Sequence, residues 1–413
     1  MYNQKTSSRR TRGKYTRNAR FSHSKRSGGF RGGSSQFSAR RGRSKSQKLD
    51  ISSFINKTAS SSVPEKIFVP EHSFADFEIN PVLLRSIEQL RYAQPTPIQD
   101  KIIVPILQKK DVVGLANTGT GKTAAFLIPL IENVLQNSHE QILITTPTRE
   151  LAQQIEQELR GLTKQMRIYS VACVGGEHIG IQIRKLQRKS NFIIGTPGRL
   201  IDLVKRGNLM LNEVHTVVLD EADRMLDMGF IHDIRFLMSR ISEKRQTLCF
   251  SATMSTTIER LIADFLKDPS TISVKTVETP KNIEQDVIRV RNLNKVDVLH
   301  DLLKNDEFKK VLVFGRTKHG VENLSRILMR RGIKVESIHG NKTQAQRKRA
   351  LLSFKQNRVQ ILVATDVAAR GLHISNITHV INYEIPETYD DYIHRIGRTG
   401  RGTQKGKALT FID

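Results

Sequence analysis

The chain has 413 residues, of which 38% are hydrophobic, and its 67 lysines and arginines outnumber its 40 aspartates and glutamates to give a formal net charge of +27. This is enough apolar material for about two domains, so a wholly disordered protein is excluded. A basic surplus of this size is typical of proteins that bind a polyanion such as nucleic acid. No apolar run approaches the roughly 20 residues of a spanning helix, and the first residues lack the apolar core of a secretion signal, so we expect a soluble, cytoplasmic protein.

Residues 1–62 form the first predicted segment, a disordered basic tail. Sixteen of them are lysine or arginine and Asp50 is the only acid, so little of this segment could form a core. The run Gly28–Ser35 is similar to arginine-glycine tails, in which arginine contacts phosphate or stacks on bases and glycine keeps the segment pliable. We therefore expect RNA binding without sequence specificity; a solvated linker and a localisation signal are the alternatives.

After about Phe74 the sequence changes to short apolar β-forming runs that alternate with helical patterns. Such alternation predicts an α/β fold with parallel sheets and helices on both faces. A polar stretch interrupts the series, so we expect one domain at 63–276, a linker at 277–284 and a second domain at 285–413. The predicted strands lie in 112–116, 141–146, 169–174, 191–196, 216–220 and 247–253, and then in 310–315, 334–340, 360–366, 378–383 and 407–412.

The chain has two cysteines, and both belong to these apolar runs. Cys173 and Cys249 are too few for a metal site, and each lies in a run that is typical of a buried strand. We expect two buried, reduced thiols rather than a disulfide.

The strand predicted at 112–115 leads into a P-loop. Gly119 and Gly121 allow successive backbone N–H groups to face a phosphate, and Lys122 adds positive charge at the β and γ phosphates. The Thr123 hydroxyl can hold Mg²⁺, and Ala116 replaces the first glycine of the general pattern. We therefore expect ATP to bind residues 118–123, namely Thr118, Gly119, Thr120, Gly121, Lys122 and Thr123.

An acidic cluster follows the apolar run 216–219. Because ligands bind at the carboxyl ends of strands in such folds, carboxylates at this position indicate a catalytic site. Asp220 would hold Mg²⁺, usually through water, and Glu221 would orient and polarise the attacking water. Asp223 is also suited to stabilising the first turn of a helix.

The ordered motifs from Phe74 onward resemble those of the DEAD-box ATP-dependent RNA helicases, and look closest to bacterial members. Residues 220–223 read Asp-Glu-Ala-Asp, while Phe74 and Gln99 match the adenine-reading motif of that family. The resemblance implies two RecA-like parallel-sheet domains in tandem that use ATP and Mg²⁺. One departure is Arg91, where the family usually has glycine.

Several loops at predicted strand ends resemble the family's contacts to the RNA backbone. They carry backbone N–H groups, hydroxyls and arginines, which are suited to phosphates and not to reading bases. Each alone is also consistent with a turn or a helix cap, whereas their order along the chain is shared with the family. The predicted RNA-binding residues are Pro147, Thr148, Arg149, Gly175, Gly176, Thr196, Gly198, Arg199, Arg316, Arg347 and Thr365.

The second domain resembles the family in its catalytic arginines. Arg398 and Arg401 would neutralise charge on the γ-phosphate when the domains close. A basic patch that binds the RNA backbone is the alternative, and it fits Arg395 better than the other two. A second departure is His373, where most members have an aspartate that contacts the ribose, so we expect a weaker or rearranged contact.

The resemblance also implies residues that couple the nucleotide to RNA. Ser251 and Thr253 would hydrogen-bond to the acidic motif, and His394 would contact that motif from the second domain. The full set expected for this coupling is Asp223, Ser251, Thr253, Asp366, Arg370 and His394.

These motifs imply an ATP-dependent RNA helicase that separates short RNA duplexes or remodels ribonucleoprotein. Contacts to the 2′-hydroxyl would favour RNA over DNA. Two alternatives stay open: an ATP-gated RNA clamp or chaperone with little unwinding, and a DNA-directed helicase. The expected partners are single-stranded and short double-stranded RNA, with ribosome-assembly or RNA-degradation proteins as further candidates, and we expect a monomer.

Overall fold

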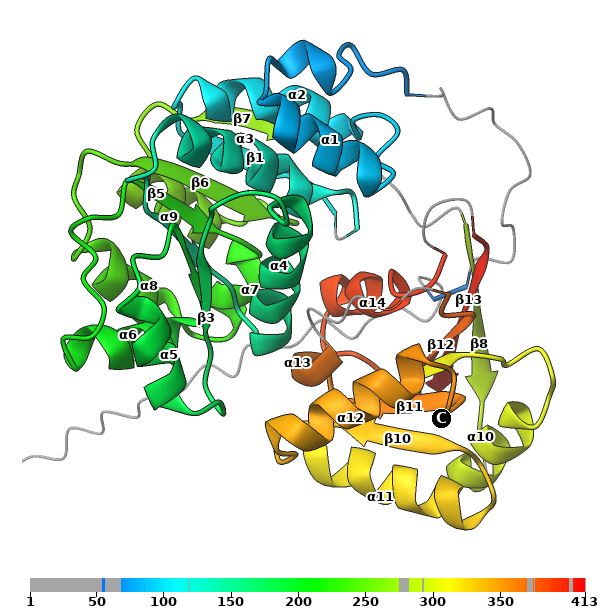
Figure 1. Cartoon of the computed structure of the whole chain (residues 1–413). Coiled ribbons are helices and arrows are strands. Elements are labelled where there is room, and N and C mark those ends of the chain that lie inside the picture. Colours follow the sequence, from blue (N-terminus) through cyan, green and yellow to red (C-terminus); the bar gives the residue numbers. More distant parts are fainter. Residues whose placement is uncertain are drawn as a thin grey trace, which may run out of the picture. The chain divides into compact units, whose positions relative to one another are not determined.

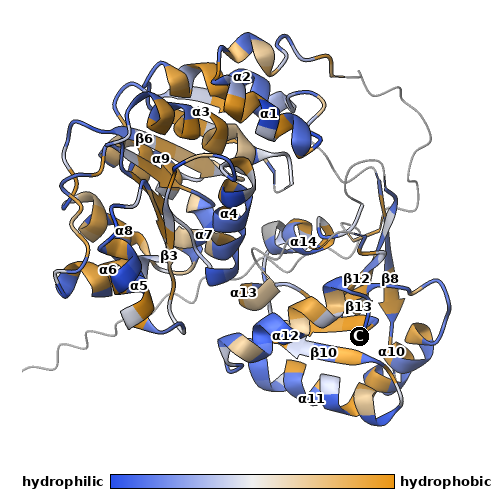
Figure 2. Cartoon of the chain, in the orientation of Figure 1, coloured by the Kyte–Doolittle hydropathy of each residue, from blue (hydrophilic) through white to orange (hydrophobic). Residues whose placement is uncertain are grey.

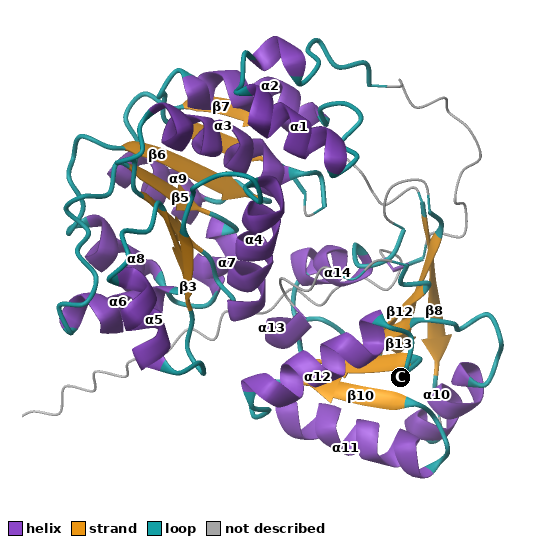
Figure 3. Ribbon diagram, in the orientation of Figure 1, coloured by secondary structure: helices purple, strands orange, loops and turns teal. Residues whose placement is uncertain are grey.

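The computed structural model describes residues 54–55, 68–117, 119–274, 282–291, 293–369, 374, 376–400 and 404–412. Within them the chain forms two parallel β-sheets with helices packed against them (Figure 1), as the alternating sequence pattern predicts. Figure 3 shows strands in orange and helices in purple. In the part of the chain that the structure describes, no helix is both long and apolar enough to cross a membrane.

The first lobe, residues 68–274, contains a seven-stranded sheet in the order β3-β4-β2-β5-β6-β1-β7. All its strand pairs are parallel. The five strands between the two edges are buried at every position, which explains why they read as continuous apolar runs. The strands are β1 (Val112–Leu115), β2 (Ile142–Thr145), β3 (Ser170–Cys173), β4 (Phe192–Gly195), β5 (Thr216–Leu219), β6 (Gln246–Ser251) and β7 (Ser270–Ser273).

Two apolar cores pack on this sheet. One combines strand residues with α1 to α4, and the other combines them with α6 to α9. The apolar residues of Figure 2 accordingly gather on the strands and on the sides of the helices that face them. The helices are η2 (Ala75–Phe77), α1 (Pro81–Gln89), α2 (Pro97–Leu107), α3 (Lys122–Gln136), α4 (Arg149–Leu162), α5 (Ile179–Leu186), α6 (Pro197–Lys205), α7 (Ala222–Asp227), α8 (Ile231–Met238) and α9 (Thr256–Phe265).

The second lobe, residues 282–412, contains a six-stranded parallel sheet in the order β10-β11-β9-β12-β13-β8. Its strands are β8 (Ile283–Arg289), β9 (Val311–Phe314), β10 (Val335–Ile338), β11 (Ile361–Ala364), β12 (His379–Asn382) and β13 (Gly406–Ile412). Its helices are α10 (Lys295–Leu303), α11 (Lys318–Arg330), α12 (Gln344–Lys355), α13 (Asp366–Ala369) and α14 (Tyr389–Ile396).

The sequence patterns located the interior strands and the edge strands β3 and β10, but missed the other two edge strands, β7 and β8. Strand β8 begins at Ile283, inside the linker expected at 277–284, and pairs with β13 along all seven of its residues. The sequence pattern missed β8 because its composition is polar and only two of its seven residues, Ile283 and Gln285, are buried. The second lobe therefore starts earlier than 285.

Strand register brings the predicted motif loops to one edge of each sheet. In the first sheet Leu115 pairs with Ser251, and Thr145 pairs with Leu219. Ladder hydrogen bonds continue one residue further, since Asp220 N donates to Thr145 O at 3.0 Å. The P-loop and the acidic cluster therefore both begin at carboxyl ends of strands in one sheet, where α/β folds bind ligands.

Candidate functional site

The P-loop has the backbone that a phosphate cradle needs. Gly119 and Gly121 have φ values of 86° and 88°, which L side chains rarely adopt, and α3 begins at the next residue, Lys122. A Cβ on Gly121 would also lie 2.6 Å from Gln99 Nε2. Lys122 is buried and donates from Nζ to Ala116 O at 2.9 Å. Backbone N–H groups and an ammonium group thus converge at a helix N-terminus, as anion binding requires.

Other P-loop residues complete this loop. Thr120 Oγ1 donates to Asn117 O at 2.9 Å, which closes the turn of the loop. Thr118, also expected to contact nucleotide, lies outside the described residues. Thr123 lies in the first turn of α3, one residue after Lys122.

Gln99 connects α2 to the P-loop. Its side-chain oxygen accepts from Thr96 N at 2.9 Å and its amide donates to Gly121 O at 3.1 Å. Phe74, the other predicted adenine-motif residue, is buried and packs against Phe77 and Tyr92, with ring centroids 6.3 and 6.5 Å away. The P-loop is therefore hydrogen-bonded to the residue expected to read the adenine.

A hollow beside the P-loop contains the groups expected to hold nucleotide and metal. Its lining residues are Gly119, Gly121, Lys122, Thr123, Leu151, Gln154, Glu158 and Asp220. Thr123 and Asp220 both line it and carry the hard oxygen atoms that Mg²⁺ prefers. The residues present therefore fit this ion.

Glu158 is a carboxyl in this hollow that the sequence patterns did not identify. Burial raises its pKa to about 7, although the hydroxyl of Tyr92 donates to its Oε1 at 3.3 Å. The same burial and the neighbouring carboxyl raise the pKa of Tyr92 to about 12. A group that changes charge near neutral pH thus lies next to the phosphate cradle.

The first two acids of the cluster are almost fully buried. Asp220 is 3% exposed and Glu221 is 4% exposed. Burial raises the pKa of Asp220, and the nearby Glu221 and Asp223 raise it further, whereas Lys122 lowers it. Glu221 has a φ of 53°, a left-handed conformation that is uncommon for residues other than glycine. This backbone conformation directs the chain from β5 into α7.

Arg224 is a site residue that the sequence reasoning missed. It is 1% exposed, and its Nη1 lies 2.8 Å from Glu221 Oε2. Its Nη2 is buried without a hydrogen-bond partner among the described residues. The spacing of three residues on a helix was the available signal, because residues three apart lie on the same face. Arg224 therefore fixes the position of the Glu221 carboxylate.

Asp223 joins the acidic cluster to the Ser-Ala-Thr sequence after β6. Its Oδ2 accepts from Ala252 N at 2.9 Å, from Thr253 N at 3.0 Å and from Thr253 Oγ1 at 3.3 Å. Ser251 Oγ in turn donates to Thr253 O at 2.7 Å. The structure thus brings together three residues that the sequence assigned to coupling, and Asp223 does more than cap a helix.

Arg149 lies against the glycine pair expected to contact RNA. A Cβ on Gly175 would come 2.9 Å from Arg149 Nη2, and Gly176 has a φ of 78° and no room for a Cβ beside the same guanidinium. The positive φ favours glycine at position 176, whereas at position 175 the contact is with the flexible end of the Arg149 side chain. Pro147 precedes Thr148, whose hydroxyl accepts from Leu151 N at 3.3 Å and caps α4.

The loop before α6 holds the next group of predicted RNA contacts. Thr196 is the N-cap of α6 and Gly198 has open space where a side chain would lie. Arg199 donates from Nη1 to Gln182 Oε1 at 2.9 Å, and the buried Gln182 donates to Val174 O at 2.9 Å. Arg199 is thus held by α5 on the same lobe as Arg149.

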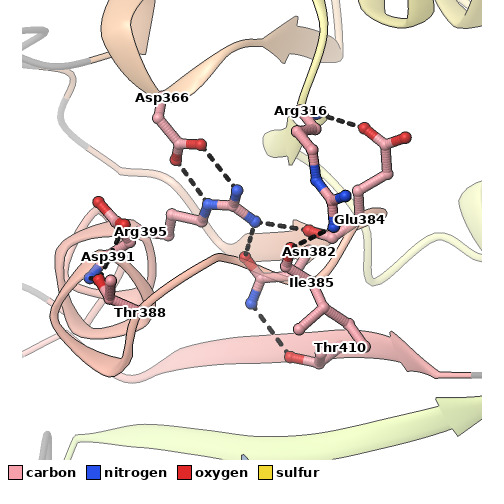
Figure 4. Close-up of polar contacts among 9 residues, drawn as sticks. All are labelled: Arg316, Asp366, Asn382, Glu384, Ile385, Thr388, Asp391, Arg395 and Thr410. Atoms are coloured by element: carbon pink, nitrogen blue, oxygen red, sulfur yellow. Dashed lines mark hydrogen bonds and ion pairs between the residues drawn. The ribbon is translucent and has the colours of Figure 1, made fainter. Parts of the chain in front are cut away.

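In the second lobe, Arg395 is bound on all sides by its own lobe (Figure 4). It makes two hydrogen bonds to Asp366, at 2.6 and 2.7 Å, and its Nη1 donates to Asn382 Oδ1 and to Glu384 O. It is 2% exposed and lies over the Phe314 ring. The expectation that Arg395 fits an RNA-backbone patch is therefore wrong, because its donors are already used inside the fold. Asp366, expected to couple the two domains, makes this pair within one lobe.

Arg316 and Thr365 line one hollow of the second lobe, beside the same ion pair. Glu384 accepts from Arg316 N, and Arg316 Nη2 donates to Ile385 O at 3.4 Å (Figure 4). Strands β9, β11 and β12 are in register, which brings these loops together at one edge of the sheet.

The remaining predicted residues are divided between described and undescribed parts of the chain. His394 and Arg398 line a single small hollow with Phe314 and Asp366. Arg347 lies in the first turn of α12. Arg370, Arg401 and His373 lie outside the described residues.

Both cysteines are free and buried, as the sequence predicted. Burial raises the pKa of each thiol to about 12. They are therefore protonated, unreactive packing residues at neutral pH.

Comparison with known proteins agrees with this geometry. A family model described as DEAD/DEAH box helicase matches residues 96–261, and one described as helicase conserved C-terminal domain matches residues 294–403. The DEAD-box ATP-dependent RNA helicase CshA of Geobacillus kaustophilus is 47% identical over 342 residues, which are 82% of this chain and 73% of that protein. CshA of Bacillus subtilis is 46% identical over 342 residues, or 82% and 69% of the two chains. The expected likeness to bacterial members is confirmed.

Solved structures show the same fold. Mss116p bound to single-stranded RNA and AMP-PNP is 31% identical, with a TM-score of 0.74, over 82% of this chain and 73% of that chain. S. cerevisiae Dbp5 bound to RNA and ADP BeF3 is 28% identical, with a TM-score of 0.72, over 82% and 89% of the two chains. The expected tandem of RecA-like parallel-sheet domains is confirmed.

Proposed function

Because the chain belongs to the family of DEAD-box ATP-dependent RNA helicases, we propose that it binds the backbone of single-stranded RNA and uses ATP to separate short duplexes or remodel ribonucleoprotein. The observation that carries this proposal is the hydrogen-bonded junction between Asp223 and the loop Ser251–Thr253. That junction ties a buried acidic cluster beside a P-loop to a further strand end of the same sheet.

The P-loop and Gln99 bind the nucleotide in this proposal. The backbone N–H groups of 119–123 and the Lys122 ammonium would hold the phosphates. Thr123 and Asp220 would hold Mg²⁺, which when bound supplies positive charge against the β and γ phosphate oxygens. Gln99 would contact the adenine edge, and Phe74 would support that contact.

Hydrolysis depends on a correctly placed carboxylate. Glu221 would orient and polarise the attacking water, and Arg224 would hold that carboxylate in place through their 2.8 Å contact. Arg398 and Arg401 of the second lobe would stabilise the charge that develops on the γ-phosphate. Asp223, Ser251, Thr253, Asp366, Arg370 and His394 would couple this step to RNA.

RNA would be held through its phosphates by the loops at the strand ends. The donors in the first lobe would be Arg149, Thr148, Thr196 and Arg199. Contacts of this kind to phosphate position the strand and do not read its bases. Arg316, Arg347 and Thr365 would contribute from the second lobe. Contacts to the 2′-hydroxyl would favour RNA over DNA.

The wider biological assignment follows the same proposal. We place the protein in the cytoplasm as a monomer, with ribosome-assembly or RNA-degradation proteins as candidate partners. The domains would occupy 63–276 and, because β8 begins at Ile283, a second region from 282 onward.

Steady-state ATP hydrolysis tests this function. Single-stranded RNA should stimulate the rate strongly, single-stranded DNA should not, and Glu221→Gln should abolish hydrolysis while ATP still binds. Equal stimulation by DNA would indicate a DNA-directed helicase. ATP-dependent RNA binding without hydrolysis would indicate a clamp.

A further inference from the structure

Phe54 is buried although it belongs to the predicted basic tail. Its side chain is 1% exposed, whereas that of its neighbour Ile55 is 40% exposed. One residue of this segment therefore packs into protein and the next faces solvent. Such selectivity is typical of an anchoring side chain and not of a chain that passes over a surface.

The residues around Phe54 all belong to the second lobe. Its cluster contains Ile283 from β8, Ala408 from β13, and Tyr392 and Ile396 from α14. The Phe54 and Tyr392 rings have centroids 4.7 Å apart and are tilted by 59°, a geometry that aromatic pairs favour. Phe54 thus fills a site formed by two neighbouring strands and one helix.

This site is also held by contacts within the second lobe. Tyr392 Oη donates to Gln285 Oε1 at 3.0 Å, so the polar end of Tyr392 is satisfied inside the lobe and its ring is held in place. Ile283 and Ala408 lie on β8 and β13, which are paired along seven residues. A rigid apolar site of this kind accepts an aromatic side chain at low entropic cost.

We propose that Phe54 anchors the N-terminal tail to the second lobe by docking at the site formed by Ile283, Tyr392, Ile396 and Ala408. Residues 1–48 contain 15 lysines and arginines and no acid. The anchor would therefore join this strongly basic segment to the second lobe. The 20 residues from Phe54 to Phe74 can extend over roughly 70 Å. The anchor is therefore a tether for the tail and does not lock the two lobes.

Fluorescence tests the docking directly, because the chain has no tryptophan. In the full chain, Phe54→Trp should give blue-shifted emission and several-fold weaker quenching by acrylamide than Ile55→Trp, the matched control at the neighbouring position, which is 40% exposed. In denaturant the two variants should become equal. The proposal would be overturned if Phe54→Trp had the same emission wavelength and the same acrylamide quenching as the control.

Hydrogen exchange covers the case in which tryptophan does not fit. Phe54→Ala should speed exchange in peptides from α14 and β8 by about tenfold, because an opening there no longer exposes a buried phenylalanine. Ile55→Ala should leave these peptides unchanged, and Phe54→Leu should restore most of the protection. Equal exchange in Phe54→Ala and wild type would also overturn docking.

The consequence for RNA rests on the proposed function and is measured separately. Phe54→Ala should keep the maximal ATPase rate but raise the RNA concentration for half-stimulation by about two- to tenfold, because a released tail has a lower effective concentration near RNA on the second lobe. Fluorescence could confirm docking while the RNA concentration for half-stimulation stays unchanged. That result would overturn the idea that the anchor holds the tail near RNA, and it would leave the helicase assignment intact. Loss of all ATPase activity in the wild type would instead overturn the proposed function.

Discussion

At the scale of single residues, the buried contact between Arg224 and Glu221 adds an orienting partner to the acidic cluster. Buried ion pairs are weak contributors to stability, since desolvation offsets most of the attraction. Their value lies in fixed geometry, and the carboxylate concerned is the one expected to activate water. The energetic role of Arg224 is therefore to limit the positions that Glu221 can adopt.

Arg224→Met tests this role. We expect kcat for ATP to fall about 10- to 100-fold, the range seen when residues that orient functional ligands are lost. The KM for ATP should change little, because Arg224 does not line the nucleotide hollow.

Arg235→Met is the matched control for Arg224→Met. Arg235 pairs with Asp264 at 2.9 Å but is exposed, so its kcat should equal that of wild type. A wild-type kcat in a folded Arg224→Met variant would contradict the orienting role.

Glu158 gives stability a dependence on pH. Its folded pKa of about 7 lies above the usual 4.5, so the native state binds this proton more tightly than the unfolded chain does. The contribution of this bound proton to the free energy of unfolding is complete below pH 4.5 and is lost as pH rises through 7. Wild type should therefore lose on the order of 1 kcal/mol of unfolding free energy between these values through this partly exposed group.

Glu158→Gln removes this titration. The variant should be more stable than wild type at pH 8, and the difference should shrink toward pH 5, as measured by urea unfolding at each pH. Glu156→Gln, on the same helix, should follow wild type. A constant difference between Glu158→Gln and wild type over this range would show that the carboxyl does not titrate near 7.

At the scale of elements, the end of α1 explains the unusual Arg91. Arg91 N donates to Glu88 O at 2.8 Å and Tyr92 N donates to Ile87 O at 3.2 Å. This is the Schellman pattern, in which the residue after the C-cap adopts a left-handed conformation and is usually glycine. Arg91 has a φ of 59° there. The turn that places Tyr92 beside Phe74 thus forms in spite of the arginine.

Arg91→Gly should stabilise the protein by about 0.5 kcal/mol. Relief of the left-handed strain, roughly 1 kcal/mol, is partly offset by the larger entropy of glycine in the unfolded chain. Thermal unfolding measures the change. Arg91→Ala removes the charge but keeps Cβ, so it should give no gain; equal gains in both variants would assign the effect to charge.

Helices and a strand of the second lobe are joined by an ion pair and hydrogen bonds. The pair between Asp366 and Arg395 connects the start of α13 to α14, and Asn382 and Glu384 bring the end of β12 into the same network (Figure 4). The loop at Thr365, which the proposed function assigns to RNA binding, is therefore supported by a helix and a strand end.

At the scale of the whole molecule, the proposed function requires ATP and RNA to favour one common state. Two ligands that do so must raise each other's affinity by the same factor. We expect a nonhydrolysable ATP analogue to tighten RNA binding about 5- to 150-fold, and RNA to tighten binding of the analogue by an equal factor. Fluorescence anisotropy of labelled RNA and of labelled nucleotide provides the two measurements.

Ser251→Ala with Thr253→Ala tests the route of this coupling. These changes remove the hydroxyls next to Asp223, so each ligand should bind alone as in wild type while the coupling factor falls toward one. Unchanged coupling in this variant would exclude the two hydroxyls as the connection and leave the backbone N–H bonds of Ala252 and Thr253 to Asp223 as the remaining route.

The sequence by itself determined the interior strands, the P-loop and the family motifs. These features are local: apolar runs specify strands buried on both faces, and a glycine-rich turn before a helix specifies a phosphate cradle. Arg91, His373 and the basic tail could also be read from the sequence, although His373 and almost all of the tail lie outside the described residues.

Tertiary structure alone decided which side chains act on one another. Arg224 on Glu221, Glu158 beside the P-loop, Arg395 within the second lobe and the site of Phe54 all depend on burial and on the register of distant segments. The edge strands β7 and β8 were hidden for a related reason, since their pairing with β1 and β13 compensates for weak apolar patterns. Local sequence specifies backbone and chemistry, whereas pairing partners and pKa shifts arise only when segments far apart in the chain exclude water together.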